Sequence, residues 1–235
     1  EYAAKNGLSV VMIEKDHIGG TCLNEGCIPT KTLCHQAKVI DTLTDAENFG
    51  LSGMSYSIDF PKIMERKETV IYQLKNGIEV LMQQSGVTVI MGEARLKDEH
   101  TVSVGEEEYT AKNIIIATGS HAKMPLIEGI DSDIVITSRE LLHIHDIPKR
   151  LCIVGAGVIG MEFASVFSSF GSEVTVIEFL KESLPVLDSD IAKRLRQTLA
   201  KRGVNFYMQS AVKEISGHTV IFERKNKMEQ IEADL

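Results

Sequence analysis

One segment of this chain, residues 151–178, constrains the fold more than any other. It reads, in order, as a strand at Leu151–Val154, the complete G-x-G-x-x-G turn Gly155–Gly160, an apolar helix at Met161–Phe170, a strand at Val174–Ile177 and an acid at Glu178. This order predicts a βαβ unit with a parallel sheet. In such a unit the glycines make a tight turn, let the backbone approach a dinucleotide pyrophosphate and let helix and strand pack closely, and the helix N-terminus holds the pyrophosphate. The alternative is a glycine turn in an α/β fold that binds no nucleotide.

The first residues of the chain indicate part of a second, related unit. Residues 2–7 read as the end of a helix with Gly7 at its C′ position, and the apolar run Leu8–Ile13 predicts a buried parallel strand. Glu14 closes that strand, where a Rossmann unit places the acid that accepts ribose hydroxyls. We expect the first strand and its Gly-rich turn to lie before residue 1, so that the strand at residues 8–13 keeps an unpaired apolar edge.

The remaining pattern predicts an α/β fold class, with two Rossmann-like dinucleotide-binding units and a small antiparallel β meander. Both units are expected to be incomplete, because the chain begins inside the first helix of one and ends at Leu235 before the other is finished. The further elements expected from periodicity and turn residues are helices at Ile28–Asn48, Phe60–Gln84 and Asp188–Arg202, strands at Val87–Met91, Asn113–Ala117, Val204–Met208 and Thr219–Phe222, the meander at Ala94–Thr110 and a hairpin turn at Lys225–Lys227.

Two cysteines, Cys22 and Cys27, stand five positions apart. In a regular helix their Cα atoms would lie roughly 8.6 Å apart, whereas a disulfide tolerates up to about 6.8 Å. A bridge therefore requires a distorted turn, which Gly26 and the turn-forming Asn24 permit. Pro29 suits a first helical turn, so the regular helix is expected to begin beside Cys27, where a helix N-terminus favours a thiolate.

The segment from Gly19 to Lys31, G-G-T-C-L-N-E-G-C-I-P-T-K, resembles the redox-active site of the flavin-dependent pyridine nucleotide–disulfide oxidoreductases. The resemblance implies that Cys22 exchanges with the substrate disulfide and that Cys27 faces the flavin; the alternative is two buried thiols that happen to lie close. The resemblance extends over all 235 residues of this chain, but these residues correspond to only about half of a complete family member. The family's interface domain, which supplies a catalytic His–Glu pair across the dimer, is expected to be absent, and none of the seven histidines has a matching context.

The resemblance also implies roles for further residues. Lys31 corresponds to a lysine near the flavin, with Glu162 as its acidic partner; the alternative for Lys31 is an ordinary surface lysine. The implied domains are an FAD-binding domain at residues 1–125, a connecting segment at 126–147 and an NAD-binding domain at 148–235. The implied contacts to FAD come from Glu14, Lys15, Gly19, Gly20, Thr21, Lys31, Ala94, Thr118, Gly119 and Ser120, and those to NAD from Gly155, Gly157, Val158, Ile159, Gly160, Glu178 and Val212.

The residues after the second strand favour NAD over NADP. The 2′-phosphate of NADP needs cationic partners at this place, where the chain reads Glu178-Phe179-Leu180. Within the family, C-L-N-x-G-C-I-P-T-K is most similar to the motif of the dihydrolipoamide dehydrogenases, which implies oxidation of dihydrolipoamide by NAD through Cys22 and Cys27. Glu25 departs from the apolar residue common there, and we expect it to face solvent.

Two alternatives to this function remain open: a non-catalytic fragment of such an enzyme, and a related NAD(P)H-dependent disulfide or mercuric reductase. We expect the chain by itself to be inactive. The implied partners are lipoamide or the lipoyl domain of 2-oxoacid dehydrogenase or glycine cleavage complexes, and a second copy in a homodimer.

The composition of the chain argues against three other classes of protein: nucleic-acid-binding, membrane-spanning and zinc-binding. The net charge of −8 disfavours nucleic-acid binding, and no apolar run reaches the ~20 residues that span a bilayer. Beside the close pair, Cys34 and Cys152 read as packing residues, and no Cys or His spacing suggests zinc. One dithiol and two packing cysteines fit a reducing compartment, for which we expect the cytoplasm.

Overall fold

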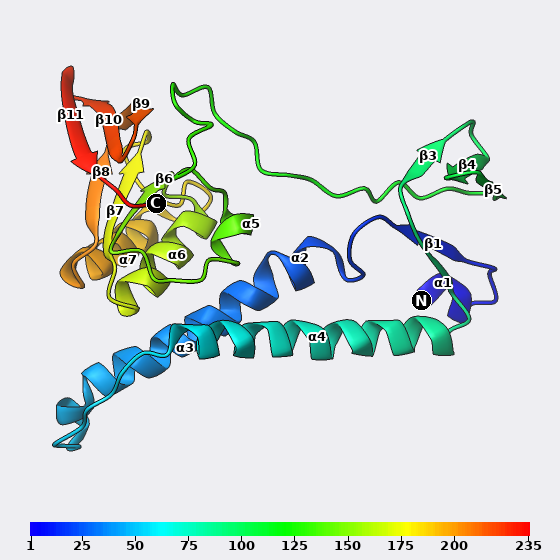
Figure 1. The fold of residues 1–235 in the computed structure, drawn as a ribbon, viewed down its shortest axis with the longest axis horizontal. Coiled ribbons are helices and arrows are strands. Elements are labelled where there is room, and N and C mark those ends of the chain that lie inside the picture. The colour runs from blue at the N-terminus through cyan, green and yellow to red at the C-terminus, as the bar shows by residue number, and fades with distance from the viewer. The chain divides into compact units, whose positions relative to one another are not determined.

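The computed structural model describes residues 1–235, and the chain folds into two compact units (Figure 1). Unit 1 comprises residues 1–29 and 68–121, and unit 2 comprises residues 30–67 and 122–235. Helices α3 (Cys27–Thr44) and α4 (Phe60–Gln84) each contribute to both units. Each unit contains a parallel and an antiparallel sheet, so the expected α/β class is confirmed. The division into cofactor domains at residues 125 and 148 stays a prediction.

Unit 1 holds a two-stranded parallel sheet and a three-stranded antiparallel meander. Strand β1 pairs with β2 in parallel from Val11↔Thr88 to Glu14↔Met91. The meander β3-β4-β5 confirms the expectation for residues 94–110. Besides parts of α3 and α4, its elements are α1 (Tyr2–Lys5), β1 (Val11–Glu14), α2 (Gly20–Asn24), β2 (Thr88–Met91), β3 (Ala94–Leu96), β4 (Thr101–Val104) and β5 (Glu107–Thr110).

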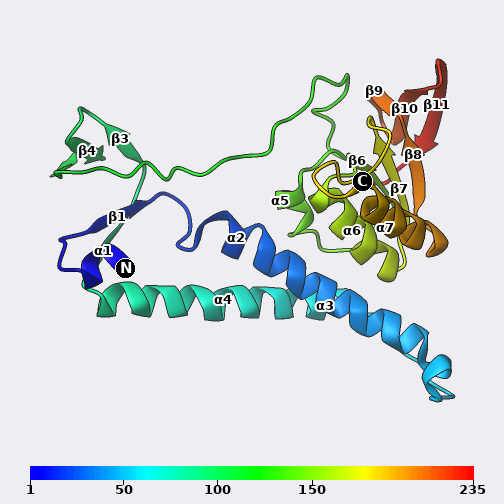
Figure 2. The ribbon, with the colours of Figure 1, turned by 180° about the vertical axis from the view of Figure 1, so that it is seen from behind.

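Unit 2 holds the parallel sheet β6-β7-β8 and the antiparallel sheet β11-β10-β9, seen from both sides in Figures 1 and 2. Besides its parts of α3 and α4, its elements are η1 (Ala46–Phe49), α5 (Ser138–Leu141), β6 (Arg150–Val154), α6 (Val158–Ser169), β7 (Glu173–Glu178), α7 (Ser189–Lys201), β8 (Asn205–Met208), β9 (Ser210–Ser216), β10 (Thr219–Arg224) and β11 (Lys227–Glu232).

The core of unit 2 forms around α6, because this helix is apolar on most of its surface. Phe163, Val166 and Phe167 are buried between the sheet and helices α3 and α4. Leu33 of α3 and Phe60 of α4 belong to the same cluster. The helix that begins at Cys27 is therefore held by the core of unit 2 over its later turns.

Turns and caps in unit 2 agree with the sequence pattern. Asp188, the N-cap of α7, accepts a hydrogen bond from the Asp190 N–H at 3.0 Å. Lys225 and Asn226 join β10 to β11 with φ values of 50° and 59°, which is typical of a tight hairpin turn. The predicted βαβ unit and the hairpin are both confirmed.

Three expectations about elements were wrong. Residues 113–117 form no strand, and Ile115 and Ile116 are 88% and 68% exposed, because no neighbouring strand pairs with this run. The strand expected at residues 8–13 covers only Val11–Glu14 and is half-buried rather than buried; it pairs with β2 along one edge and keeps its other edge unpaired, as expected. The helix expected to reach Asn48 ends at Thr44, and a single 3-10 turn follows it.

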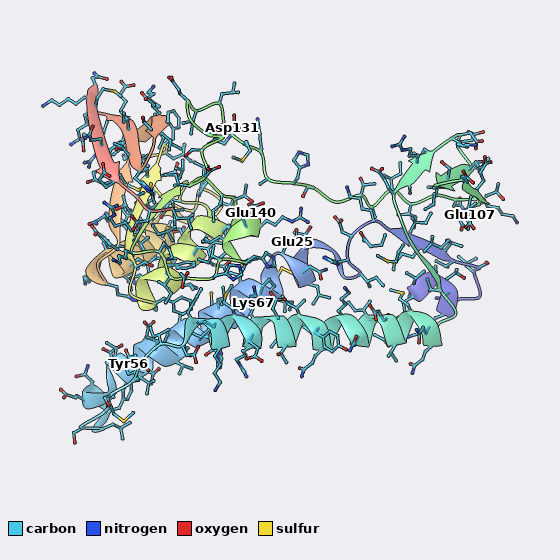
Figure 3. All side chains as sticks on the ribbon, in the orientation of Figure 1. Glu25, Tyr56, Lys67, Glu107, Asp131 and Glu140 are labelled. Carbon is cyan, nitrogen blue, oxygen red and sulfur yellow. A yellow bond between two sulfur atoms is a disulfide. The ribbon has the colours of Figure 1, made fainter.

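Lys67 is a buried residue that the sequence pattern did not reveal (Figure 3). Its side chain is among the most buried of the structure, at 1% exposure, and its ammonium donates to the carbonyl of Leu142 at the end of α5. A buried cation is stabilised by a hydrogen-bond acceptor and by the negative end of a helix. Lys67 thus ties α4 to α5 within unit 2.

No helix in the structure combines the length and the apolar character that a bilayer crossing requires.

Candidate active site

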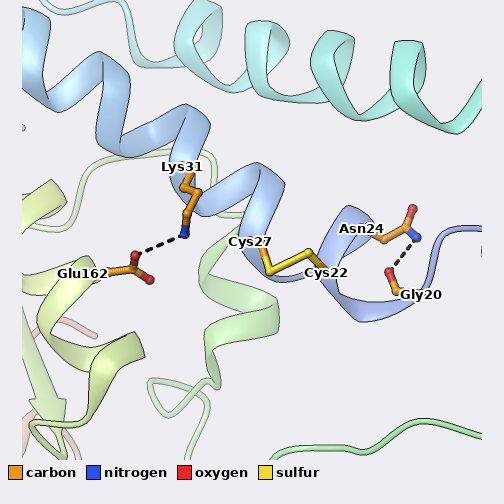
Figure 4. Close-up of a disulfide and its surroundings, with 6 residues drawn as sticks. All are labelled: Gly20, Cys22, Asn24, Cys27, Lys31 and Glu162. Atoms are coloured by element: carbon orange, nitrogen blue, oxygen red, sulfur yellow. Dashed lines mark hydrogen bonds and ion pairs between the residues drawn. A yellow bond between two sulfur atoms is a disulfide. The ribbon is translucent and has the colours of Figure 1, made fainter. Parts of the chain in front are cut away.

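The two motif cysteines are joined by a disulfide (Figure 4). Cys22 lies in the short helix α2 and Cys27 is the first residue of α3, and their Cα atoms are 4.7 Å apart. The helix is interrupted between them at Glu25 and Gly26, as the spacing required. A Cβ on Gly26 would lie 2.9 Å from the carbonyl oxygen of Thr21, so this position needs glycine for the two short segments to approach.

Asn24 holds the turn that carries the disulfide. Its side-chain amide donates to the carbonyls of Ile18 at 3.1 Å and Gly20 at 3.0 Å. These bonds fold residues 18–24 onto themselves and leave both Cys22 and Cys27 exposed. Because the Cys27 sulfur lies at the N-terminus of an 18-residue helix, the partial positive charge there favours a thiolate once the bridge opens.

Lys31 lies one turn beyond Cys27 on α3, and its Nζ is 3.6 Å from Oε1 of Glu162 on α6 (Figure 4). The side chains are 67% and 33% exposed, so this ion pair adds little to stability. The exposed ammonium remains available to a bound group. The pairing itself is observed, whereas the role of Lys31 beside a flavin stays a prediction.

The other two cysteines belong to the packing of unit 2. Cys34 packs against the main core cluster, and burial raises the pKa of its thiol. Cys152 lies in β6, where burial raises its pKa to about 12. Neither thiol has the surroundings of a reactive cysteine.

Glu25, the residue between the two bridged cysteines that was expected to face solvent, is only partly exposed.

The glycine turn of unit 2 fits a dinucleotide. Gly155 has φ of 110°, which a side chain would resist, and a Cβ on Gly155 or Gly157 would meet open space. A Cβ on Gly160 would lie 2.2 Å from the carbonyl oxygen of Gly155 and 3.1 Å from Ile153. The first glycine therefore makes the turn, the second leaves room for a pyrophosphate, and the third lets α6 pack on β6. Val158 and Ile159 begin α6 and are exposed beside this turn.

Glu178 ends β7 and is only 8% exposed. Its Oε2 accepts a 2.6 Å hydrogen bond from the N–H of Ala156, inside the glycine turn, and its Oε1 accepts one of 2.6 Å from the N–H of Leu180. The predicted ribose acceptor is therefore also bound to the backbone of the turn. Sequence reasoning missed this part of the site, because the pattern marks Glu178 but not what its oxygens contact.

The residues of unit 1 with implied cofactor contacts are exposed except for Glu14. Its Oε1 accepts from the N–H of Asp16 at 2.9 Å, the same local bond that Glu178 makes to Leu180. A Cβ on Gly19 would lie 2.2 Å from Leu23, so Gly19 allows α2 to turn back closely. The exposed residues are Lys15, Gly19, Gly20, Thr21, Ala94, Thr118, Gly119 and Ser120, and their contacts to FAD stay predictions.

Val212 lies on β9 of unit 2 and is half-buried. It packs against the smaller core cluster with Ile177 and Phe222. Its implied contact to NAD stays a prediction.

Comparisons with known proteins agree with this geometry. The whole chain, residues 1–235, matches the family described as pyridine nucleotide-disulphide oxidoreductase. It is 43% identical to a dihydrolipoyl dehydrogenase of Acholeplasma laidlawii, covering 99% of this chain and 71% of that protein. It is 37% identical to a dihydrolipoyl dehydrogenase of Mycoplasma genitalium, covering 98% of this chain but 51% of that protein.

Among solved structures, the HOCl-induced flavoprotein disulfide reductase RclA of Escherichia coli matches with a TM-score of 0.83 and 33% identity, over 99% of this chain and 51% of that one. The chain thus spans about half the length of most of these relatives. The family match covers the full sequence. It agrees with the disulfide at the start of α3 and with the glycine turn whose Ala156 N–H donates to Glu178. The chain belongs to the pyridine nucleotide-disulphide oxidoreductase family.

Proposed function

We propose that the protein containing this chain is an NAD-dependent dihydrolipoyl dehydrogenase, which oxidises dihydrolipoamide to lipoamide through Cys22 and Cys27. The observation that carries the proposal is the exposed Cys22–Cys27 disulfide at the N-terminus of α3. Identity of 43% to a relative described as a dihydrolipoyl dehydrogenase supports the choice of substrate within the family.

The disulfide supplies the first half of the reaction. A thiolate of dihydrolipoamide attacks Sγ of Cys22, the bond to Cys27 breaks, and Cys27 leaves as a thiolate stabilised by the helix N-terminus. The second substrate thiol then attacks the substrate sulfur of the mixed disulfide, so that lipoamide forms and Cys22 is released. The substrate loses two electrons and two protons, and the protein disulfide becomes a dithiol.

The residues around the disulfide prepare the onward transfer. FAD and NAD, when bound, would supply the hydride chemistry that takes the two electrons from the dithiol and reduces NAD to NADH. Lys31 places a positive charge one turn beyond Cys27, and Glu162 orients that ammonium. Cys27 is the nearer of the two sulfurs to Lys31 along the chain, which agrees with Cys22 exchanging with substrate and Cys27 facing the flavin.

We assign the nucleotide as NAD because a buried carboxylate, Glu178, lies beside the glycine turn. A 2′-phosphate would meet this negative charge, and the two residues that follow, Phe179 and Leu180, offer no cation. The whole protein is proposed to act as a homodimer on the lipoyl domains of 2-oxoacid dehydrogenase or glycine cleavage complexes. A cytoplasmic location is proposed from the cysteine usage alone.

The test is a cysteine substitution in the full-length protein. Cys27→Ser removes the bridge, so we expect lipoamide turnover with NAD to be lost while bound flavin stays at the wild-type amount. Cys34→Ser is the matched control, because Cys34 lies on the same helix outside the bridge, and its turnover should stay close to wild type. Normal turnover by the Cys27→Ser protein would contradict the proposal.

A second candidate, reduction of another disulfide, is favoured by the structural similarity to a flavoprotein disulfide reductase. The two candidates separate in one assay. Turnover with lipoamide that greatly exceeds turnover with oxidised glutathione supports the first, and the reverse supports the second.

A further inference from the structure

The backbone of the glycine turn is held from both sides at Ala156. This residue is fully buried, and its N–H donates to Oε2 of Glu178 at 2.6 Å. Its carbonyl accepts from the N–H of Leu184 at 2.8 Å. The two peptide groups that flank Ala156, between Gly155 and Gly157, are therefore fixed by the last residue of β7, Glu178, and by Leu184 in the segment after it. We call residues 178–184 the clamp segment.

The clamp segment is itself anchored to the rest of unit 2. Oε1 of Glu178 accepts from the Leu180 N–H, and the Leu180 carbonyl accepts from the N–H of Gln209 at 3.0 Å. Glu182 receives two hydrogen bonds from Arg196 of α7, at 2.6 Å and 2.8 Å. These contacts connect the segment to α7 and to Gln209, which lies between β8 and β9, so its position does not depend on a bound nucleotide.

Leu184 carries local backbone strain at the point where it contacts the turn. Its φ is 52°, which is unusual for a residue with a branched side chain, and it is 3% exposed. Such a conformation persists only where its surroundings impose it. The Leu184 side chain is buried in the main core cluster of unit 2, and its N–H donates to the Ala156 carbonyl.

A turn with glycine on both sides of Ala156 would otherwise sample many conformations, and ordering it would weaken ligand binding. We propose that the clamp segment holds the pyrophosphate-binding turn in its binding geometry before a nucleotide arrives. Glu178 and Leu184 are then positioning residues for the pyrophosphate, in addition to any contact of Glu178 with ribose. This inference rests on the proposed binding of NAD at the same turn.

The first test needs no ligand. In the full-length protein without nucleotide, hydrogen–deuterium exchange of the peptide covering residues 155–160 is measured for wild type and for Glu178→Ala. Loss of a hydrogen bond to a charged acceptor should raise the exchange rate at the turn by about tenfold. Glu173→Ala is the matched control, because Glu173 is an exposed acid at the other end of β7 and should leave the rate unchanged. An unchanged rate in Glu178→Ala overturns the inference.

The second test separates positioning from ribose recognition. Affinity is measured for NADH and for an analogue that lacks both hydroxyls of the adenosine ribose. If Glu178 acted only on those hydroxyls, Glu178→Ala would not affect binding of the analogue, and that result overturns the inference. We expect the variant to weaken the analogue about tenfold, because the turn has lost its support.

Leu184→Ala extends the test to a residue away from the ribose. It should speed exchange at residues 155–160 and weaken NADH and NADPH by the same factor, so that the preference between them is unchanged. Glu178→Gln, which keeps one acceptor oxygen and nearly the same shape, should fall between wild type and Glu178→Ala and serves if the alanine variant fails to fold. Wild-type protein that binds no NADH would contradict the proposed function, whereas the exchange test would still decide the clamp.

Discussion

Strands β1 of unit 1 and β7 of unit 2 share one local pattern and differ in burial. Each is a β-branched apolar run that ends in a glutamate, and each lies in a parallel sheet. Strand β7 is paired on both edges and buried from Val174 to Glu178, whereas β1 is paired only with β2 and Val11 is 45% exposed. The pattern therefore predicts a strand in both places, but burial depends on the neighbours that the fold supplies.

The two terminal acids differ in the same way. Glu14 and Glu178 both accept the N–H two residues further along the chain. Only Glu178 also bonds a glycine turn and is buried by it. A strand that ends in glutamate therefore forms the local hydrogen bond in both units. The second bond, to a glycine turn, forms only in unit 2, where that turn packs against the end of the strand.

The largest expected effect tests the difference in burial directly. Phe167→Ala should lower the free energy of unfolding by about 3–5 kcal/mol, because Phe167 is 1% exposed and contacts Phe163 and Phe170 in the core of unit 2. Met12→Ala, in the half-buried β1, should cost about 1 kcal/mol or less. Urea unfolding of both variants measures this, and equal losses would contradict the comparison.

The second prediction distinguishes the packing glycine of the unit 2 turn from the glycine that leaves room for a ligand. Gly160→Ala should lower the free energy of unfolding by about 1–3 kcal/mol, because the new Cβ would meet the backbone of Gly155. Gly157→Ala should leave stability almost unchanged, since its Cβ meets open space, but should weaken NADH binding. Thermal unfolding and a binding titration check the pair, and a Gly157→Ala protein with normal affinity would argue against a pyrophosphate at this turn.

The third prediction concerns pH. The hydrogen bonds from Arg196 lower the pKa of Glu182 to about 2 from its ordinary value of 4.5. In this window the unfolded chain binds more protons than the folded one, so the stabilisation is complete above pH 4.5 and is lost as the pH falls toward 2. Glu182→Gln should cost about 1 kcal/mol at pH 7 and progressively less below pH 4.5. Unfolding measured across this range tests it; a difference that does not shrink in acid would assign the effect to packing.

The smallest expected effect is in the meander of unit 1. Lys97 and Glu108 form an ion pair across the sheet, but both side chains are about half exposed. Glu108→Gln should therefore change the free energy of unfolding by no more than about 0.5 kcal/mol. Denaturant titration beside Glu182→Gln compares an exposed pair with a more buried one, and a larger loss from Glu108→Gln would reverse the ranking.

Much of the fold and of the site followed from the sequence because local chemistry decides it. The glycine spacing at residues 155–160 predicts the turn and the close packing of α6, and Gly26 predicts the break that lets Cys22 reach Cys27. The hairpin at Lys225–Lys227 depends on two neighbouring residues and was also predicted. In each case the residues that determine the structure lie within a few positions of one another.

Tertiary structure decided what depends on partners distant in the chain. The run at residues 113–117 has strand propensity, yet it stays exposed because no strand offers it an edge. Lys67 is buried because the carbonyl of Leu142, 75 residues later, accepts its ammonium. Ala156 is likewise bound by Glu178 and Leu184, which lie 22 and 28 positions later in the chain. The glycine pattern predicts the turn around Ala156 but not these two hydrogen bonds. Hydrogen-bond partners and burial are properties of the packed chain, so a local pattern cannot specify them.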